Sequence, residues 1–331
     1  MLSFTLRRLA SMVGVILVLI AVAFILQQLS GSDPARAKLG PNASKVVVAA
    51  ERKRLGYDDP LPVQYVHYVE HAFGGNLGVS LRTGQPVTSD LSSLLPASLE
   101  LVLFSLLLGV PLSLILGIAG AARWRGLGLF RFGLLTAGAA PQFLLGTLGI
   151  LLLYHDLRWL PASGRTSYVQ APNGPTGLLV LDSLLHGRPE IAVDAIDHLL
   201  MPALSLALLP AVAVGRVLRG SMITNLRADH VRVARSKGLS EWQVLIRHCL
   251  RNSAGPALAM SGLMLGLVFE GLVVVETIFA WPGIGSYVDV SIPKDDLPAI
   301  TGVTLLLGAA YVVVNTIVDL LQAAADPRIR S

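Results

Sequence analysis

Charged residues are scarce in this sequence. Only 14% of its 331 residues are Asp, Glu, Lys or Arg, whereas 53% are hydrophobic, and the mean hydropathy is +0.65. Soluble domains carry about 25% charged residues, so a water-exposed surface on this chain would lack polar cover. The composition therefore excludes an ordinary soluble protein and indicates that lipid is the main solvent.

Cysteine and the usual catalytic constellations are also lacking. The single cysteine, Cys249, excludes an internal disulfide framework and a cysteine-rich metal site. His67 and His71 have helical i,i+4 spacing, but no third ligand lies nearby in the sequence, so we expect no metal site. No Ser/His/Asp set and no paired carboxylates stand out, and we therefore expect no catalytic residue.

A nucleotide-binding loop is missing as well. The sequence has no GxxxxGK[ST] segment and no Gly-Lys pair at all, and such a segment cradles the nucleotide phosphates in P-loop proteins. Energy for any uphill process must therefore come from another chain or from an ion gradient.

Long uncharged runs are what the sequence has instead. A helix needs roughly 20 apolar residues to cross a hydrocarbon core of about 30 Å. The sequence predicts an all-α membrane protein with six such spans: Leu9–Leu29, Leu101–Ala122, Phe132–Tyr154, Leu199–Gly215 (continuing to about Arg219), Asn252–Phe269 (continuing towards Phe279) and Leu297–Val318.

Two features of these runs need interpretation. Two arginines precede the first run, as in a signal peptide, but its about 20 residues exceed the usual h-region of about 7–15 residues, so we expect a retained helix. Pro111, Pro141, Pro202 and Pro210 lie inside spans. A helix bundle tolerates them when neighbouring helices satisfy the freed backbone groups.

The placement of basic residues predicts the orientation. With the N-terminus in the cytoplasm, the cytoplasmic segments carry 15 Lys and Arg and the short external segments carry 4. Residues 30–96 are left out because long loops follow the positive-inside rule poorly. Both termini are therefore expected in the cytoplasm, and the net charge of +5 is interpreted as membrane topology and not as nucleic-acid binding.

The loops predict the domain organisation. Residues 1–96 should form the first transmembrane helix and an extracytoplasmic subdomain, and residues 97–331 a five-helix core with a cytoplasmic loop at 216–252. The second external segment, His155–Asp197, should be a loop with one short helix. It either binds an external partner or only connects two spans.

The cytoplasmic loop 216–252 contains the densest local signals. Asp229 can cap a short helix that runs to Lys237. Val231 and Ala234 lie on one apolar stripe of that helix. The loop therefore contains more structure than a simple connection requires.

A turn and a second helix should follow. Gly238 suits the left-handed position after a helix end, which would bring Leu239 back onto the first helix. Ser240 and Gln243 have the spacing of a capping box, and Leu239 and Val244 that of a hydrophobic staple. The loop is thus predicted to be helix, glycine turn, helix.

Three interpretations compete for this element. It docks into a cytoplasmic partner, or its basic residues only anchor it to anionic lipid, or it is a DNA-binding helix-turn-helix. The third is disfavoured because the loop is tethered to the membrane at both ends. The residues alone leave the first two open.

The residues of this loop resemble a known motif. The segment Asp229–Ser240 is similar to the cytoplasmic coupling motif of ABC importer permeases, in the form found in peptide transporters. The nearest likeness is to the B-type dipeptide/oligopeptide permease subunits, and it extends over essentially the whole chain. Further segments that fit are Leu55–Pro60, Arg82–Val87, Trp159–Gly164, Val274–Gly285 and Asp319–Arg330.

Two departures from the family pattern stand out. The general motif opens with Glu-Ala-Ala, where this chain has Arg232, Val233 and Ala234, although Gly238 keeps its spacing. This change resembles the variant of the peptide subfamily. Glu270 differs more, because the family usually has a small residue near that position.

The resemblance implies the transmembrane domain of a type I ABC importer in a bacterial plasma membrane. An extracytoplasmic binding protein would deliver peptides or a related small solute, and this chain and a second homologous permease would form the path. Two ATPase subunits or domains, which bind ATP and Mg²⁺, would drive alternating access. This chain would hold no cofactor and contact lipid but no nucleic acid. The alternative is a secondary transporter that uses an ion gradient.

The resemblance also implies roles for particular residues. Val231 and Ala234 would offer an apolar docking face to the ATPase, and Arg232 and Arg235 would pair with its acids. The residues expected to couple transport to the ATPase are Asp229, His230, Val231, Arg232, Val233, Ala234, Arg235, Gly238 and Leu239.

Acidic residues inside the spans are the candidates for the translocation path, because charge there is expensive and usually functional. Glu270 either faces the path and meets a cationic group of the substrate, or is neutral or paired within the bundle. Glu276 is expected to support an outer gate together with Pro282, Gly283 and Gly285. Glu100 is expected at the membrane interface.

Overall fold

The protein is all-helical in the part that the structure, a computed structural model, describes. An isolated antiparallel bridge joins Val79 and Pro86, and the described residues contain no strand. The described residues are 2–29, 39, 43–54, 56–122, 128–172 and 174–325, with backbone only for 2–9, 130, 321 and 323–325.

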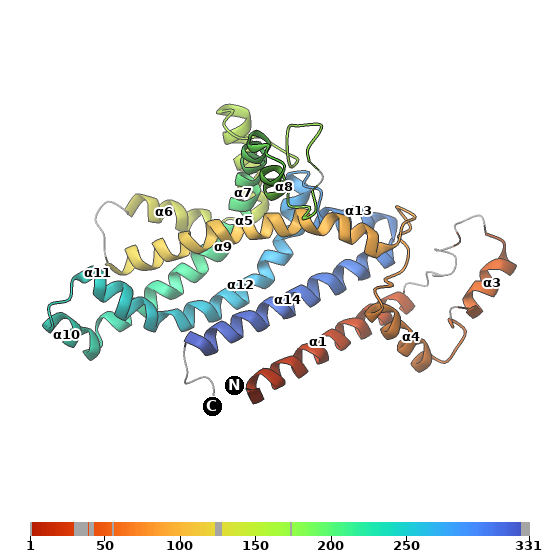
Figure 1. Ribbon diagram of the computed structural model, residues 1–331, viewed down its shortest axis with the longest axis horizontal. Helices are drawn as coiled ribbons and strands as arrows, with labels where there is room; N and C mark the ends of the chain where they lie inside the picture. Colours follow the sequence, from red (N-terminus) through yellow and green to blue (C-terminus); the bar gives the residue numbers. More distant parts are fainter. Residues whose placement is uncertain are drawn as a thin grey trace. The chain divides into compact units, whose positions relative to one another are not determined.

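Figure 1 shows the helices in chain order. The long helices contain the apolar runs and extend beyond them; α5, for example, begins at Val87, well before the expected start of the second span. The elements are α1 (Leu2–Leu29), α3 (Lys45–Arg54), α4 (Leu61–Phe73), α5 (Val87–Ala122), α6 (Gly128–Ala137), α7 (Gln142–Gly149), the π-helix η1 (Ile150–Asp156), α8 (Leu179–Leu185), α9 (Pro189–Leu226), α10 (Asp229–Ser236), α11 (Glu241–Gln243), the π-helix η2 (Val244–Leu250), α12 (Arg251–Ile278), α13 (Ile284–Ser291), the 3₁₀ helix η3 (Ile292–Lys294) and α14 (Leu297–Ala325).

The described residues contain five to six candidate spans, where the sequence predicts six. Five helices in this part of the chain are long and apolar enough to cross a membrane, and the count reaches six when the bent pair of residues 131–137 and 142–156 is taken as one span. Pro202 and Pro210 lie inside the continuous α9, and α5 passes through Pro111 without a break. These three prolines are therefore accommodated within helices.

The third span, expected at Phe132–Tyr154 with Pro141 inside it, is interrupted by a bend. The helix axis turns by 115° between α6 and α7, where turn and bend residues precede Pro141. Proline has no N–H to donate, and it disfavours helical dihedrals in the residue before it. The helix is interrupted before Pro141, and Pro141 takes the N-cap position of α7.

One compact unit comprises residues 99–281 and 314–331. Helix α12 packs along α9, α7 contacts both, and α8 also packs on α9. At Gly138, a Cβ atom would lie only 2.4 Å from a methyl group of Val212, so glycine lets the bend after α6 approach α9. Helix α9 is the centre of this unit, because 61% of its most apolar 18-residue segment is buried.

The other compact unit comprises residues 2–98 and 282–313. Helix α4 packs on α1 through Phe24, whose ring centroid lies 5.5 Å from Tyr65 and 5.6 Å from Tyr68. A buried polar contact, Ser80 Oγ to Asp296 Oδ2 at 2.5 Å, joins the segment before α5 to the start of α14. The proposed division of the chain at residues 96 and 97 stays a prediction.

Candidate functional site

The helix α10 ends in the turn that the sequence predicts. Gly238 has φ +78°, and its N–H donates to the carbonyl of Arg235 at 2.9 Å. The N–H of Leu239 reaches back to the carbonyl of Ala234 at 3.4 Å. This pair of bonds is a Schellman motif, which satisfies two carbonyl groups at the helix end.

The second helix of the loop begins with a capping box, as predicted. The N–H of Gln243 donates to Ser240 Oγ at 3.3 Å, and the N–H of Ser240 donates to Gln243 Oε1 at 3.0 Å. From Glu241 the helical chain continues to Ile278 as one span-length segment. The turn at Gly238 is therefore directly connected to the fifth span.

Asp229 does not cap α10 in the way that the sequence suggests. Ala228 occupies the N-cap position without a side-chain cap bond, and Asp229 is the first helical residue. Its carboxylate instead forms an ion pair with Arg232, one turn further on. An acid in the first turn still opposes the partial positive charge of the helix N-terminus.

The expected docking face on Val231 and Ala234 is also wrong. Val231 is fully buried and Ala234 is 4% exposed. Both belong to an apolar cluster of this chain that includes Met222, Val244 and Cys249. The stripe thus holds α10 against its own protein, because burying apolar side chains stabilises the packed element.

Arg235 is paired within the chain and not held for a partner. It binds Glu241 through Nε–Oε1 at 2.8 Å and Nη2–Oε2 at 3.0 Å, and this hydrogen bond raises the pKa of Arg235. The pair bridges the two helices across Gly238. With Arg232 bound to Asp229, both arginines expected to meet partner acids already have acids in this chain.

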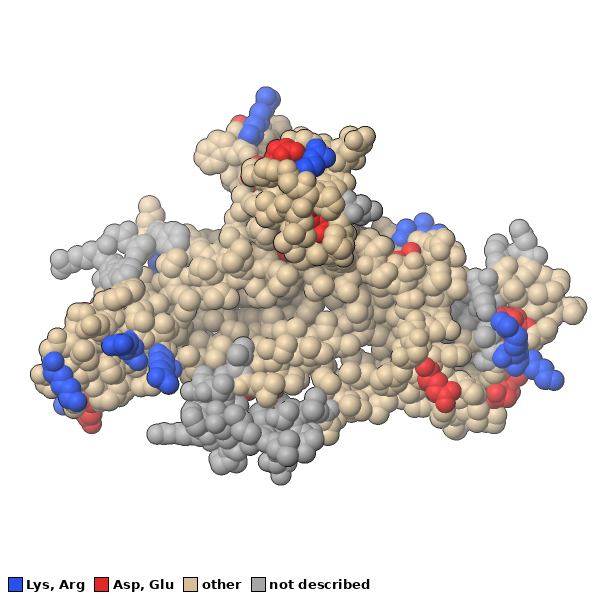
Figure 2. Space-filling view, viewed as in Figure 1, with Lys and Arg blue, Asp and Glu red and all other residues tan. Residues whose placement is uncertain are grey.

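A different face of the loop is available to a partner. Val233 is 51% exposed and Trp242 is 56% exposed, and His230 and Lys237 are exposed as well. In Figure 2, basic side chains gather near α10 and the helical segment that follows it, while the surface of the spans is almost free of charge. The helix pair thus has an apolar inner face and a mixed basic and apolar outer face.

Glu270 lies on an exposed stripe of α12. Exposed residues recur along one side of this helix at Leu263, Leu267, Glu270, Val274 and Thr277. The spacing of three and four residues places them on one face. Glu270 therefore points away from the core of its own unit.

A neighbouring helix reaches α12 next to this acid. A Cβ at Gly271 would lie 1.9 Å from Gln142 Oε1, so the Gln142 amide rests on the α12 backbone. Because Gln142 follows the proline break, the bend after α6 brings a polar group to the level of Glu270.

Glu276 is fully buried near the end of α12. The chain then turns through Ala280, with φ +46°, and the N–H of Trp281 donates to the Glu276 carbonyl at 2.8 Å. Phe279 and Trp281 are each 1% exposed. Glu276 is thus part of a tightly packed helix end.

The remaining gate candidates belong to the other compact unit. Gly283 is the N-cap of α13, and the N–H of Ile284 donates to Ser98 Oγ at 2.9 Å. Gly285 is buried, whereas Pro282 is exposed. Glu276 and these residues fall in different units, and their common role in a gate stays a prediction.

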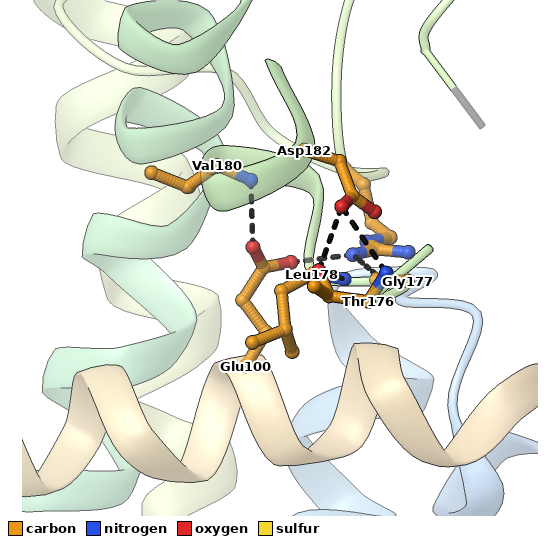
Figure 3. Close-up of polar contacts among 7 residues, drawn as sticks. Glu100, Thr176, Gly177, Leu178, Val180 and Asp182 are labelled. Carbon is orange, nitrogen blue, oxygen red and sulfur yellow. Dashed lines mark hydrogen bonds and ion pairs between the residues drawn. The ribbon is translucent and has the colours of Figure 1, made fainter. Parts of the chain in front are cut away.

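A buried ion pair that holds segment 155–197 was not predicted from the sequence. Glu100 lies inside α5 and not at its end; its side chain is 4% exposed, and it pairs with Arg165. Its other oxygen accepts the N–H of Val180 at 2.8 Å, as Figure 3 shows. An acid inside a long apolar helix was the available signal, but its partner lies 65 positions away.

Two more acids hold the same segment in place. Asp182 accepts hydrogen bonds from the N–H and Oγ1 of Thr176 (Figure 3). Asp194 accepts from Thr166 Oγ1 at 2.6 Å and from the N–H of Ser167 at 2.8 Å. The predicted short helix is present as α8, and these bonds give the loop around it a defined shape.

The spans and the capped loop together define a multi-pass membrane protein that holds a shaped, basic element between two of its spans. Comparison with protein families agrees. Residues 109–331 match the model described as binding-protein-dependent transport system inner membrane component, and residues 1–102 match the model of its N-terminal part.

Individual relatives cover nearly the full length. The chain is 41% identical to a probable D,D-dipeptide transport system permease protein of Escherichia coli, over 96% of this chain and 95% of the relative. It is 37% identical to a di/tripeptide transport system permease protein of Pseudomonas aeruginosa, over 100% and 99%. It is 33% identical to a glutathione transport system permease protein of Salmonella typhimurium, over 100% and 99%.

The chain belongs to the family of binding-protein-dependent transport system inner membrane components. It is therefore a non-catalytic, multi-pass inner membrane subunit of an ABC importer, whose partners include a binding protein and ATP-binding cassette subunits. The alternative of a secondary transporter driven by an ion gradient is set aside.

Proposed function

We propose that this permease carries short peptides. The names of relatives at 33–41% identity refer to dipeptides, tripeptides and glutathione, which share a peptide backbone, a free amino group and a free carboxylate. The exposed Glu270 on α12 supports this proposal, because a carboxylate facing a water-filled path can attract the amino group of a peptide.

We further propose that a second homologous permease completes the path and that two ATPase subunits or domains bind ATP and Mg²⁺. Both termini of this chain lie in the cytoplasm in this arrangement. The excess of basic residues on that side supports the orientation. Residues 326–331 lie outside the described part of the chain.

The element at Asp229–Leu239 is proposed to transmit the motion of the ATPase. The observation that carries this proposal is that two features hold α10 in place. These are the Schellman turn at Gly238 and the apolar stripe of α10, which is buried against the rest of the chain. A helix held in this way moves with the spans to which it is joined. The partner meets the outer face, which includes His230, Val233 and Lys237.

The proposed function is tested by transport in a reconstituted system. The chain is purified with its second permease, ATPases and binding protein, placed in proteoliposomes, and supplied with labelled dialanine, trialanine or glutathione. We expect uptake that needs ATP, Mg²⁺ and the binding protein. Peptide uptake by this chain alone, or ATP-dependent uptake of none of these peptides, would contradict the proposal.

A further inference from the structure

The chain reverses direction sharply after the π-helix η1. The N–H groups of Trp159 and Leu160 both donate to the carbonyl of Leu153, at 2.8 and 3.3 Å. Arg158, between the helix and these residues, has φ +53°. The turn therefore has a defined, hydrogen-bonded geometry.

Two features that occur often at functional sites coincide in this turn. π-Helical segments are rare and are frequent at functional sites. A left-handed arginine is also uncommon, because its Cβ crowds the backbone. Such strained residues persist where the surrounding structure holds them and cluster at ligand sites.

The turn lines an open hollow of about 520 Å³. This volume lies within the range of about 300–1,000 Å³ that is usual for small-molecule sites. Two of the lining side chains are large and accessible: Tyr154 is 49% exposed and Trp159 is 70% exposed. The lining residues are Tyr154, His155, Arg158, Trp159, Leu160 and Pro161.

The charges around the hollow leave one cation uncommitted. The segment from 150 to 197 contains three arginines and no lysine. Arg165 pairs with Glu100, and Arg188 pairs with Glu190 at 3.1 Å. Among the residues that the structure describes, the guanidinium of Arg158 has no ion pair and no hydrogen bond.

The remaining ionisable groups of the hollow do not neutralise Arg158. His155 Nδ1 lies 2.9 Å from Asp156 Oδ1, so this neighbouring acid is engaged by the histidine. Arg158 thus stands in a strained turn, on the wall of a hollow, with its charge available to an anion from outside.

We propose that this hollow binds the terminal carboxylate of a short peptide. The planar guanidinium of Arg158 suits a carboxylate, which it can hold by two parallel hydrogen bonds. Tyr154 and Trp159 offer apolar surface to the rest of the peptide. The inference rests on the proposed peptide function and assigns to this chain a residue that distinguishes peptides with a free carboxylate.

Binding is measured on the purified full-length chain in nanodiscs. Tryptophan fluorescence is recorded during titration with dialanine and with dialanine amide, which lacks the carboxylate. Arg158→Gly removes the charge and retains a residue that accepts the left-handed backbone. Arg158→Lys keeps the positive charge but lacks the planar guanidinium that can form two parallel hydrogen bonds. Arg188→Gln is the matched control, because Arg188 is already paired with Glu190. Trp159→Phe shows whether Trp159 gives the fluorescence signal.

We expect dialanine to bind the native chain about tenfold or more tightly than the amide, and Arg158→Gly to lose this preference, because hydrogen bonds to charged groups are among the strong ones. Arg158→Lys should retain part of the preference, and Arg188→Gln all of it. Equal binding of both probes to the native chain, or an unchanged preference in Arg158→Gly, would overturn the proposal.

The outcome is separable from that of the proposed function. If the complete system transports peptides while Arg158→Gly changes neither dialanine binding nor uptake, the carboxylate site is refuted and the peptide function stands. A variant that weakens only the association of the binding protein assigns Arg158 to a protein contact and likewise refutes the site. Carboxylate-dependent binding without peptide transport supports the site and contradicts the function.

Discussion

Gly238 offers the sharpest test of the coupling role proposed for Asp229–Leu239. It has φ +78°, and a Cβ at this position would meet no heavy atom within 4 Å. A Cβ atom therefore adds no steric clash with the described part of the protein. For alanine, the effect of the substitution then comes from the backbone conformation that the Schellman turn requires.

The size of that effect follows from the backbone. An L-residue in the left-handed region costs roughly 1–2 kcal/mol, and asparagine is the least affected side chain. We expect Gly238→Asn to be mild, Gly238→Ala to destabilise by about 1 kcal/mol, and Gly238→Val, which is β-branched, to destabilise most. If the turn opens, Leu239 leaves Ala234, and α10 loses its fixed relation to the fifth span.

The control is Gly220 in α9, where a Cβ would likewise meet no heavy atom within 4 Å but the backbone is not left-handed. Gly220→Ala should stabilise slightly, by up to about 1 kcal/mol, because alanine is the better helix former. Thermal unfolding of the purified chain gives the stability. The ratio of peptide transported to ATP hydrolysed in proteoliposomes gives the coupling.

We expect the coupling ratio to fall from Gly238→Asn through Gly238→Ala to Gly238→Val and to be unaffected in Gly220→Ala. Gly238→Val with native stability and native coupling would refute this expectation. Equal losses at both glycines would show a general intolerance of larger residues and not a role of the left-handed turn.

Three further predictions concern other contacts. Glu100→Gln or Arg165→Met should lower the unfolding free energy by about 3–5 kcal/mol, because the other partner of the buried pair is left without its counter-charge. Arg188→Gln on the surface should change it by less than about 1 kcal/mol. Thermal melts measure both, and equal effects would contradict a special role for the buried pair. Burial raises the pKa of Tyr287 from 10.0 to about 12. The stability that the neutral Tyr287 contributes should therefore be complete below pH 10 and be lost as pH rises towards 12. Tyr287→Phe should remove this loss in melts at alkaline pH, and a pH profile that Tyr287→Phe leaves unchanged would refute the prediction. Glu270→Gln should alter the preference among cationic, neutral and anionic peptides in uptake assays. If the uptake of all these peptides is unchanged, Glu270 has only a structural role.

Local sequence signals predicted the shape of the loop around Gly238 well, because its geometry depends on neighbours in the chain. The left-handed glycine, the capping box and the short helix each arise from residues within a few positions of one another. The same is true of the apolar spans, whose length and hydropathy are properties of continuous segments.

The failures concern what a residue meets across space. Val231 and Ala234 were correctly placed on one apolar stripe, but only packing against Met222 and Cys249 decides that this stripe faces inward. The partner of Arg235 is Glu241, six positions further on and across the Gly238 turn.

The break at Pro141 is an intermediate case. The proline is visible in the sequence, but α5 and α9 pass through their own prolines. Whether a helix bends at such a residue depends on which neighbours satisfy the freed backbone groups. In the third span, that balance gives a 115° turn.

The scarcity of charge, the uncharged runs and the local caps were sufficient to identify a membrane protein with a shaped loop between two spans, because hydropathy and capping are short-range properties. Tertiary structure alone decided which face of α10 is accessible, that Glu100 meets Arg165, and that Arg158 has no partner among the described residues. Each of these depends on the distance between residues far apart in the chain, and that distance is set by the packing of whole helices.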